Sequence, residues 1–445
     1  MMRCYYSMAT FINIHADNNS RMEMSSKNLL IVEDSKPIAV VIERLAVSLG
    51  YKTTIASSFA VVKKLLSQQH KYFAATVDYG LPDAPDGQVV PYIIENGIPA
   101  IIMTGRMDDA TRKKLLNFPI VDYVTKENAQ AYHYLMRVLH GQLTNHTIGV
   151  LVVDNSTAER NHIAQLLKRR NFKVYSVDNG TQALQVLEKQ TDIKIVITEQ
   201  EMTGMDGIEL VHKIRKMHAK NEMIIIGVSG SSRSFQSARF IKNGADDFLR
   251  KPFCPEEFYC RVIQSIEKLK YIEDIKSAAD NDYLTSLANR RRFIELVAEQ
   301  LKDPTKTDLV KVLAIVHIDN FKNINDEHRH QAGDEVLVSF STLFAKHFSA
   351  NAQVARLSGA EFSVFAIGED AGEIEDKLKK MQAQASKNVV KHESKNINYT
   401  VSIGGVVIDG DSDFHASLAT AAESLKQANA KGKSQLVVEG FIDLG

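Results

Sequence analysis

Residues 29–35 have the sequence LLIVEDS, and residues 150–156 have the sequence VLVVDNS. Each stretch is a short apolar run that ends in polar and acidic residues, as a buried strand does where it reaches a turn. The second stretch follows the first by 121 residues, which is the size of one small domain. A repeat of that period predicts two consecutive domains of one fold, with a joint near residues 140–147.

Apolar runs and amphipathic segments alternate along both halves of the repeat. FAATV at 73–77 and AIIM at 100–103 have the length of buried strands. Residues 37–49 predict a helix, because the segment places five apolar side chains on one helical stripe: Ile38, Val41, Ile42, Leu45 and Leu49. Strands that alternate with helices predict an α/β fold, a doubly wound parallel sheet with helices on both faces.

The composition excludes several classes of protein. The 445 residues include 54 basic and 54 acidic residues, so no overall charge attracts the chain to DNA or to anionic lipid. No apolar run approaches the roughly 20 residues that span a bilayer. Residues 1–26 lack the features of a signal peptide, and we expect a disordered leader there. We therefore expect a cytoplasmic protein that binds neither DNA nor a membrane.

Reactive side chains follow the predicted strands of the first repeat. Glu33 and Asp34 end its first strand, Asp78 the third, Thr104 the fourth and Lys126 the fifth. Because parallel strands present their carboxyl ends at one edge of the sheet, these groups are expected to meet there. Three carboxylates suit a Mg²⁺ ion, and the metal and the lysine together would neutralise a phosphoryl group attacked by the third-strand aspartate.

On these residues, positions 27–145 resemble a receiver domain of the CheY-like, flavodoxin-like type. The resemblance implies that Asp78 accepts a phosphoryl group from a sensor histidine kinase or a phosphotransfer protein. It implies a Mg²⁺ ion held by three acids: Glu33, Asp34 and Asp78. The other implied residues sense or contact the phosphoryl group: Thr104 and Tyr123 as switch residues, and Lys126 as its contact.

Residues 146–270 resemble a second receiver domain whose reactive residues have changed. Asn155 stands at the position of a metal-binding acid, and Glu199 at that of the phospho-acceptor aspartate. We therefore predict that this domain is not phosphorylated and acts as an adaptor or a dimerisation surface. Two interpretations of Glu199 are open: it imitates a phosphorylated aspartate by reaching Lys251, or it is a solvated acid. We prefer the solvated acid, because a fixed mimic depends on geometry that a sequence does not show.

Residues 271–445 are expected to form a linker helix followed by an α+β domain. This domain resembles the GGDEF family of nucleotide cyclases, whose members join two GTP molecules into cyclic di-GMP across a dimer. Four segments carry the resemblance: DYLTSLANRRR at 282–292, HIDNFKNINDEHRHQAGDEVL at 317–337, RLSGAEF at 356–362 and VSIGG at 401–405. A near-heptad apolar stripe from Phe258 to Ile275 suits pairing with a second helix, so we expect a homodimer.

Three positions of this domain depart from the family's pattern. His317 and Ala360 occupy the positions of its metal-binding acids, and Ser358 replaces the first glycine of its hairpin motif. Imidazole is a poor ligand for Mg²⁺ and alanine has none to offer, so we predict that cyclase activity is lost. The alternative is an active diguanylate cyclase with unusual metal ligation through Asp319 and Glu361.

Other positions retain residues that the family uses to contact nucleotide. The resemblance implies guanine contacts from Asn325 and Asp334, and phosphate contacts from Lys322 and Lys433. A competing interpretation gives Asn325 and Asp334 roles in helix capping and turn formation, so GTP binding is left open.

Together these features predict a two-component response regulator that is phosphorylated on Asp78 and acts by binding. What it binds would be an active cyclic di-GMP enzyme or a guanine nucleotide.

Overall fold

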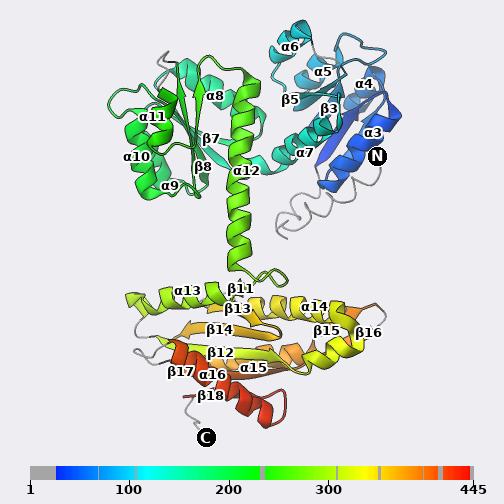
Figure 1. Ribbon diagram of the computed structural model, residues 1–445. Helices are drawn as coiled ribbons and strands as arrows, with labels where there is room; N and C mark the ends of the chain where they lie inside the picture. The colour runs from blue at the N-terminus through cyan, green and yellow to red at the C-terminus, as the bar shows by residue number, and fades with distance from the viewer. Residues whose placement is uncertain are drawn as a thin grey trace. The chain divides into compact units, whose positions relative to one another are not determined.

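The computed structural model describes residues 27–68, 70–105, 108–230, 236–306, 309–348, 352–393, 395–408 and 414–440 (Figure 1). The leader predicted over residues 1–26 lies outside these ranges. The chain divides into two compact units, with the boundary between Leu269 and Lys270. Within the described ranges, no helix combines the length and the apolar character that crossing a membrane requires.

The first domain contains a five-stranded parallel sheet with the strand order β2-β1-β3-β4-β5. Its strands are β1 (Asn28–Val32), β2 (Lys52–Ala56), β3 (Ala74–Asp78), β4 (Ala100–Thr104) and β5 (Asp122–Thr125). Its helices are α3 (Lys36–Ser48), α4 (Phe59–Ser67), α5 (Val89–Glu95), α6 (Asp109–Leu116) and α7 (Ala129–Thr144). Helices α3 and α7 cover one face of the sheet, and α4, α5 and α6 cover the other. The predicted doubly wound fold is confirmed.

The stripe predicted for the first helix is correct in part. Ile42 and Leu49 are buried, whereas Val41 is 36% exposed. Ala39 and Ala46 lie in the core instead. Their small side chains let the backbone of α3 approach the sheet, which a pattern of large apolar residues does not indicate.

The second domain repeats this topology with the strand order β7-β6-β8-β9-β10. Its strands are β6 (Gly149–Val153), β7 (Lys173–Val177), β8 (Ile193–Glu199), β9 (Ile224–Ser229) and β10 (Asp247–Arg250). Its helices are α8 (Thr157–Arg169), α9 (Gly180–Lys189), α10 (Gly207–Met217), α11 (Gln236–Lys242) and α12 (Pro255–Asp280). A short 3-10 turn, η1 (Asn145–Thr147), precedes β6 at the predicted joint.

Helix α12 has a buried part and an exposed part. Between residues 255 and 269, Phe258, Val262 and Leu269 are buried in the core of the second domain. Farther along, Tyr271 and Ile275 are 66% and 70% exposed. The predicted stripe therefore serves first as a domain core and then as an uncovered apolar surface.

The unit that follows Leu269 holds a six-stranded mixed sheet with the strand order β11-β13-β14-β12-β17-β18 and a separate hairpin, β15-β16. The strands are β11 (Ala288–Asn289), β12 (Val310–Ile318), β13 (Ala352–Ser358), β14 (Glu361–Gly368), β15 (Val389–His392), β16 (Lys395–Asn398), β17 (Val401–Ile408) and β18 (Leu436–Glu439). The helices are α13 (Arg290–Leu301), η2 (Pro304–Lys306), α14 (Phe321–His347), α15 (Ala371–Lys387) and α16 (Phe414–Ala430). Helices α14 and α15 pack on one face of the sheet, and α13 and α16 on the other.

A buried arginine joins the first two domains. Arg170, which follows α8, is 4% exposed and forms an ion pair with Asp122 of β5. It also donates to the hydroxyl of Tyr134 on α7 at 3.1 Å, and its guanidinium lies 4.3 Å from the ring centre of Tyr259 on α12. Burial lowers the pKa of the guanidinium, but the charge of Asp122 outweighs that effect and raises it. One cation therefore satisfies buried groups from both domains at once.

We expect Arg170→Ala to lower the free energy of unfolding of the first unit by about 3–5 kcal/mol, because the change leaves the Asp122 carboxylate buried without a cation. The measurement is urea unfolding of the full chain. The matched control is Arg137→Ala, which removes a second ion pair between the same domains, to Glu267, whose side chains are 50% and 36% exposed. That control should cost at most about 1 kcal/mol. Equal effects of the two substitutions would contradict a structural role for the buried arginine.

Candidate functional site

The register of the first sheet brings its acids to one edge. Strand β1 pairs with β3 so that Val32 lies opposite Val77, which places Glu33 and Asp78 side by side just beyond this pair. Strand β4 lies on the other side of β3, and its last residue, Thr104, reaches the same edge. The predicted convergence of side chains at the carboxyl ends of the strands is confirmed.

Lys126 forms ion pairs with two of these acids. Its Nζ lies 2.6 Å from Glu33 Oε2 and 2.7 Å from Asp78 Oδ2. Burial lowers the pKa of this lysine, but the hydrogen bonds and charges of the two carboxylates outweigh burial and raise it. The pKa of Glu33 is also raised, chiefly by burial and further by the charge of Asp78, against the effect of Lys126. The site thus concentrates negative charge that one ammonium group offsets only in part.

The same edge fits a divalent cation. Ligand oxygens of Glu33, Asp34 and Asp78 all lie within 4.8 Å of one another. Glu33 Oε1 is buried and accepts no hydrogen bond, so it retains lone pairs for a ligand. Carboxylate oxygens are the ligands that Mg²⁺ prefers. A hollow of about 560 Å³ opens beside the acids and is also lined by Thr104 and Lys126, which leaves room for a phosphoryl group.

Tyr123 connects this edge to the second domain. Its hydroxyl donates to Glu256 Oε1 at 2.8 Å, and Glu256 belongs to the first turn of α12. Arg112 of α6 donates to the same oxygen at 2.7 Å. Burial raises the pKa of Tyr123 to about 12, and Glu256 adds to that effect. Burial would raise the pKa of Glu256, but the Arg112 and Tyr123 hydrogen bonds outweigh it and hold this pKa below its ordinary value.

At the equivalent edge of the second domain, a lysine is paired with both acids. Lys251 Nζ lies 2.6 Å from Glu199 Oε2 and 2.8 Å from Asp154 Oδ2. The other oxygens accept backbone N–H groups: Glu199 Oε1 from Gln200 at 2.8 Å, and Asp154 Oδ1 from Ser156 at 2.8 Å. Burial lowers the pKa of Lys251, yet its two carboxylate partners raise it overall.

Glu199 is therefore not the solvated acid that we preferred from the sequence. It is 8% exposed and paired with Lys251. Its carboxylate meets the ammonium as closely as Asp78 meets Lys126, and burial makes an unpaired arrangement costly. Asn155 is exposed and offers no carboxylate. Within the described ranges, three potential metal ligands cluster only at Glu33, Asp34 and Asp78.

In the second unit, the positions expected to bind metal offer few ligands. His317 lies near the end of β12, opposite Glu361 of β14 and Ser402 of β17. Ala360 is buried in the apolar core, and its carbonyl accepts from the Ile318 N–H at 3.1 Å. The structure thus places a ring and a methyl group at the two predicted positions.

Asp319 is committed to a structural role. It is 3% exposed, and Thr400 Oγ1, Ser402 Oγ and the Ser434 N–H donate to its two oxygens at 2.6, 2.7 and 3.0 Å. A carboxylate with this many donors has few lone pairs left for a metal. Asp319 joins the ends of β12 and β17 to the segment before β18.

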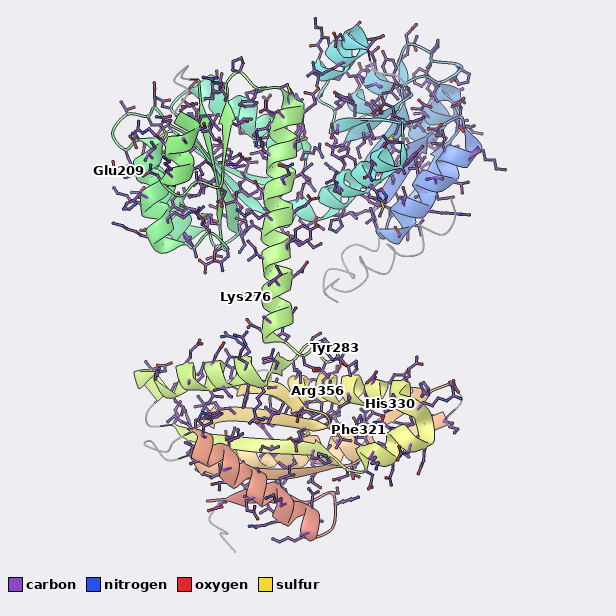
Figure 2. The ribbon with its side chains drawn as sticks, viewed as in Figure 1. Glu209, Lys276, Tyr283, Phe321, His330 and Arg356 are labelled. Atoms are coloured by element: carbon purple, nitrogen blue, oxygen red, sulfur yellow. The ribbon has the colours of Figure 1, made fainter. Side chains whose placement is uncertain are left out.

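Arg356 stabilises the turn between β13 and β14. Figure 2 labels Arg356 and also Phe321, the first residue of α14. The Arg356 guanidinium donates to the Gly359 carbonyl at 2.8 and 2.9 Å and to Asp282 Oδ1 at 2.9 Å. Burial would raise the pKa of Asp282, but the Thr285 and Arg356 hydrogen bonds outweigh it and lower this pKa. The segments at 282–292 and 356–362 therefore meet in one hydrogen-bond network.

The predicted nucleotide contacts surround an interruption in α14. The helix is broken at Arg329, which has φ 72° and ψ 164°, between Asn325 and Asp334. Asn325 Oδ1 is buried and accepts no hydrogen bond. A Cβ on Gly333 would come within 2.0 Å of this oxygen, so a larger residue there would displace the Asn325 side chain. The capping interpretation gives Asn325 no partner, whereas a guanine base has N–H donors on its Watson–Crick edge.

Two lysines stand near the same turn. Lys322 lies exposed in the first turn of α14. Lys433 contacts Asn320 Oδ1, in the residue that directly precedes α14. The adjacent Ser434 is fixed to Asp319 and Ser402 through its N–H, at 3.0 and 3.2 Å.

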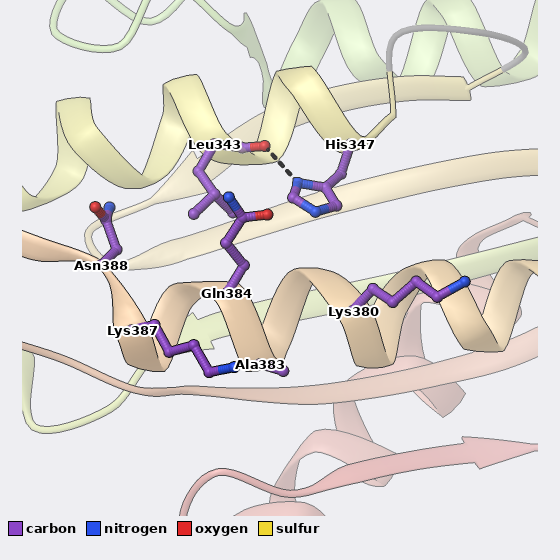
Figure 3. Close-up of a pocket in the computed structure, with 7 residues that line it drawn as sticks. All are labelled: Leu343, His347, Lys380, Ala383, Gln384, Lys387 and Asn388. Atoms are coloured by element: carbon purple, nitrogen blue, oxygen red, sulfur yellow. Dashed lines mark hydrogen bonds between the residues drawn. The ribbon is translucent and has the colours of Figure 1, made fainter.

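A separate hollow of about 710 Å³ lies between α14 and α15 (Figure 3). Its lining is Leu343, His347, Lys380, Ala383, Gln384, Lys387 and Asn388. The His347 ring contacts the Leu343 carbonyl at 3.0 Å. None of the residues predicted to contact nucleotide lines this hollow.

Sequence reasoning missed the residues that join the domains. Arg112, Glu256 and Arg170 carry no local signal, because each acts on a partner far along the chain. The hydrogen bond from Tyr123 to Glu256 joins residues 133 positions apart. The periodicity of apolar residues indicates only which face of a helix or strand is buried, so it does not predict contacts between distant polar residues.

Comparisons with known proteins agree with this architecture. The family model of the response regulator receiver domain matches residues 150–263, and that of the diguanylate cyclase, GGDEF domain, matches residues 279–435. Response regulator PleD of Caulobacter vibrioides is 27% identical over 301 residues, and the match covers 65% of this chain and 65% of PleD.

Two further relatives cover other shares of the chain. Two-component response regulator ORR5 of Oryza sativa subsp. japonica is 33% identical over 108 residues, 24% of this chain and 81% of ORR5. The crystal structure of a two-component system response regulator/GGDEF domain protein is 33% identical, covers 55% of this chain and 100% of its own, and has a TM-score of 0.49.

The two family matches agree with a parallel sheet of receiver type and with the mixed sheet that follows it. The match to ORR5 spans most of that relative at more than 30% identity. The chain belongs to the response regulators of two-component signalling, and it combines receiver folds with a GGDEF domain of the cyclic di-GMP signalling family.

Proposed function

We propose that this chain is a cytoplasmic response regulator switched by phosphorylation of Asp78, and that its GGDEF domain signals by binding and not by making cyclic di-GMP. One observation carries the proposal. Within the described ranges, Asp78 alone combines a lysine at 2.7 Å with two neighbouring acids that can share a cation.

The chemistry at Asp78 is phosphoryl transfer. A carboxylate oxygen attacks the phosphorus of a phosphohistidine on a sensor kinase or a phosphotransfer protein. The P–O bond forms as the P–N bond breaks, and the histidine ring leaves and takes up a proton. Glu33, Asp34 and Asp78 would hold a Mg²⁺ ion, which supplies positive charge to the phosphoryl oxygens. Lys126 already contacts Asp78 and supplies a second positive charge.

The signal leaves the first receiver through Tyr123. Thr104 lies at the phosphorylation edge and Tyr123 on the adjacent strand, β5, where β4 pairs with it. A Thr104 hydroxyl drawn to the phosphoryl group frees space beside the ring, and the ring then moves. Any such movement changes the bond from Tyr123 to Glu256 in α12.

The state of the GGDEF domain favours binding over catalysis. A cyclase of this family needs oxygen ligands for metal, and His317 and Ala360 supply none. The alternative, an active enzyme that binds metal through Asp319 and Glu361, is opposed by the three donors that occupy Asp319. The retained frame suits binding of a guanine nucleotide, or of an active cyclic di-GMP enzyme that presents the same domain.

Asp78 should be the acceptor when the full chain is treated with acetyl phosphate and Mg²⁺. Asp78→Asn replaces the nucleophilic carboxylate with a neutral amide, so covalent phosphate should fall to background in intact-mass spectrometry. The matched control is Glu199→Gln at the closed edge of the second receiver, which should leave the phosphate content of the protein unchanged. Persistent phosphate on the Asp78→Asn variant would contradict the assignment.

Phosphorylation should promote a dimer through the exposed half of α12. Beryllofluoride with Mg²⁺, which imitates the phosphoryl group, should raise the mass measured by light scattering toward twice the monomer. Ile275→Glu places a charge on the apolar surface and should block the shift. Lys276→Glu, which changes the next residue along the helix (Figure 2), serves as the control and should not. An unchanged mass in the wild type at micromolar concentration would count against the dimer.

Restoring the two oxygen ligands should restore some catalysis. His317→Asp with Ala360→Glu should yield cyclic di-GMP from GTP and Mg²⁺, at least about 100-fold above the wild type, because metal charge offsets the phosphates. The measurement is product quantification by mass spectrometry. Adding Asp334→Ala to the double variant should abolish the gain. Robust turnover by the wild type would overturn the binding role.

A further inference from the structure

We propose that the GGDEF domain binds guanine nucleotide through its own cations, without a divalent metal ion. This inference rests on the proposed binding of nucleotide and concerns how the phosphates are held. Its basis is the absence of an acid at His317 in β12 and at Ala360 in the turn before β14, together with two lysines near the start of α14.

A triphosphate carries several negative charges, so a site lined by acids repels it unless a metal ion stands between them. In this chain, neither His317 nor Ala360 contributes a negative charge. The repulsion that makes a metal necessary is therefore absent at both positions. His317 and Ala360 therefore do not fit a magnesium site.

The acids that remain nearby do not rebuild a metal site. Asp319 is buried, and its oxygens accept three hydrogen bonds. Glu361 lies opposite His317 on the neighbouring strand β14. The Ser358 hydroxyl lies 3.5 Å from Glu361 Oε2. No third acid, histidine or cysteine completes a cluster with these two in the part of the second unit that the structure describes.

Two lysines from separate segments of the chain lie near the start of α14. Lys322 belongs to the first turn of α14, and Lys433 reaches Asn320 just before that turn. The segment that carries Lys433 is held by the Ser434 N–H, which donates to the buried Asp319. Gly432, with φ +101°, allows the bend, and no atom would lie within 4 Å of a Cβ built on it. Lys433 is thus an exposed side chain on an anchored turn.

Asn325 supplies a further observation that points to a ligand. Its Oδ1 accepts no hydrogen bond although it is buried. The N1–H and N2–H groups of guanine are donors of the kind that an amide oxygen accepts, whereas adenine presents an acceptor at N1. The phosphates would then extend toward Lys322, on the same helix segment and one turn earlier.

Nucleotide binding at this site should depend on Mg²⁺ in the opposite way from binding at a site lined by acids. Mg²⁺ in solution neutralises part of the charge of free GTP, so a site built from ammonium groups should bind metal-free GTP at least as tightly as MgGTP. A family site with two acids has the opposite preference, because it needs the metal to approach the phosphates.

The test is calorimetric titration of the full-length protein with GTP, once in excess Mg²⁺ and once in EDTA, with ATP as the comparison nucleotide. We expect a dissociation constant in EDTA equal to or lower than that in Mg²⁺, and weaker binding of ATP in both. Lys322→Ala with Lys433→Ala should weaken GTP at least about 10-fold, which assigns the phosphates to this site. His317→Asp should weaken GTP about 10-fold in EDTA and should make binding respond to Mg²⁺.

The outcomes separate this inference from the function on which it rests. Binding of GTP by the wild type that is at least about 10-fold weaker in EDTA than in Mg²⁺ overturns metal-free binding and leaves nucleotide binding intact. Absence of GTP binding under both conditions, in protein that still accepts phosphate on Asp78, overturns nucleotide binding itself. Binding that the two lysine substitutions do not weaken places the phosphates elsewhere and also overturns the inference.

Discussion

The ion pair between a lysine and a strand-end carboxylate is the interaction on which the receiver half of this protein depends. Both receivers form it, from Lys126 to Asp78 at 2.7 Å and from Lys251 to Glu199 at 2.6 Å. In the first receiver the pair leaves Glu33 with a buried oxygen that lacks a partner. In the second receiver both acids are satisfied by the lysine and by backbone N–H groups. The same contact therefore leaves a carboxylate oxygen without a partner in the first receiver and none at the two equivalent acids of the second.

A closed second receiver explains why two copies of one fold are useful here. The buried Arg170 fixes the second receiver to the first, so the second can serve as a platform. Tyr123, the proposed switch residue, contacts Glu256 at the start of α12, the helix that leads out of the second receiver. A receiver that was itself phosphorylated would compete for the same helix. Under the proposed function, a glutamate at position 199 leaves the output under one input.

The sequence predicted the strands and the reactive edge because both depend on local order. Apolar runs mark buried strands, and each reactive side chain directly follows one, so parallel pairing has to bring them together. The burial of Glu199 was not predictable, since it depends on how far the side chain reaches toward Lys251. The Arg170 contacts and the break of α14 at Arg329 also escaped, because tertiary packing and a single backbone rotation leave no periodic signal.

The central claim is that phosphorylation at Asp78 reaches α12 through Tyr123 and Glu256. Amide hydrogen exchange of residues 255–269, with and without beryllofluoride, tests it most directly. Beryllofluoride should change exchange at the start of this helix in the wild type, and Tyr123→Phe, which keeps the ring and removes the hydroxyl, should reduce that change several-fold. A helix that keeps its exchange rates while the first receiver responds would contradict the claim.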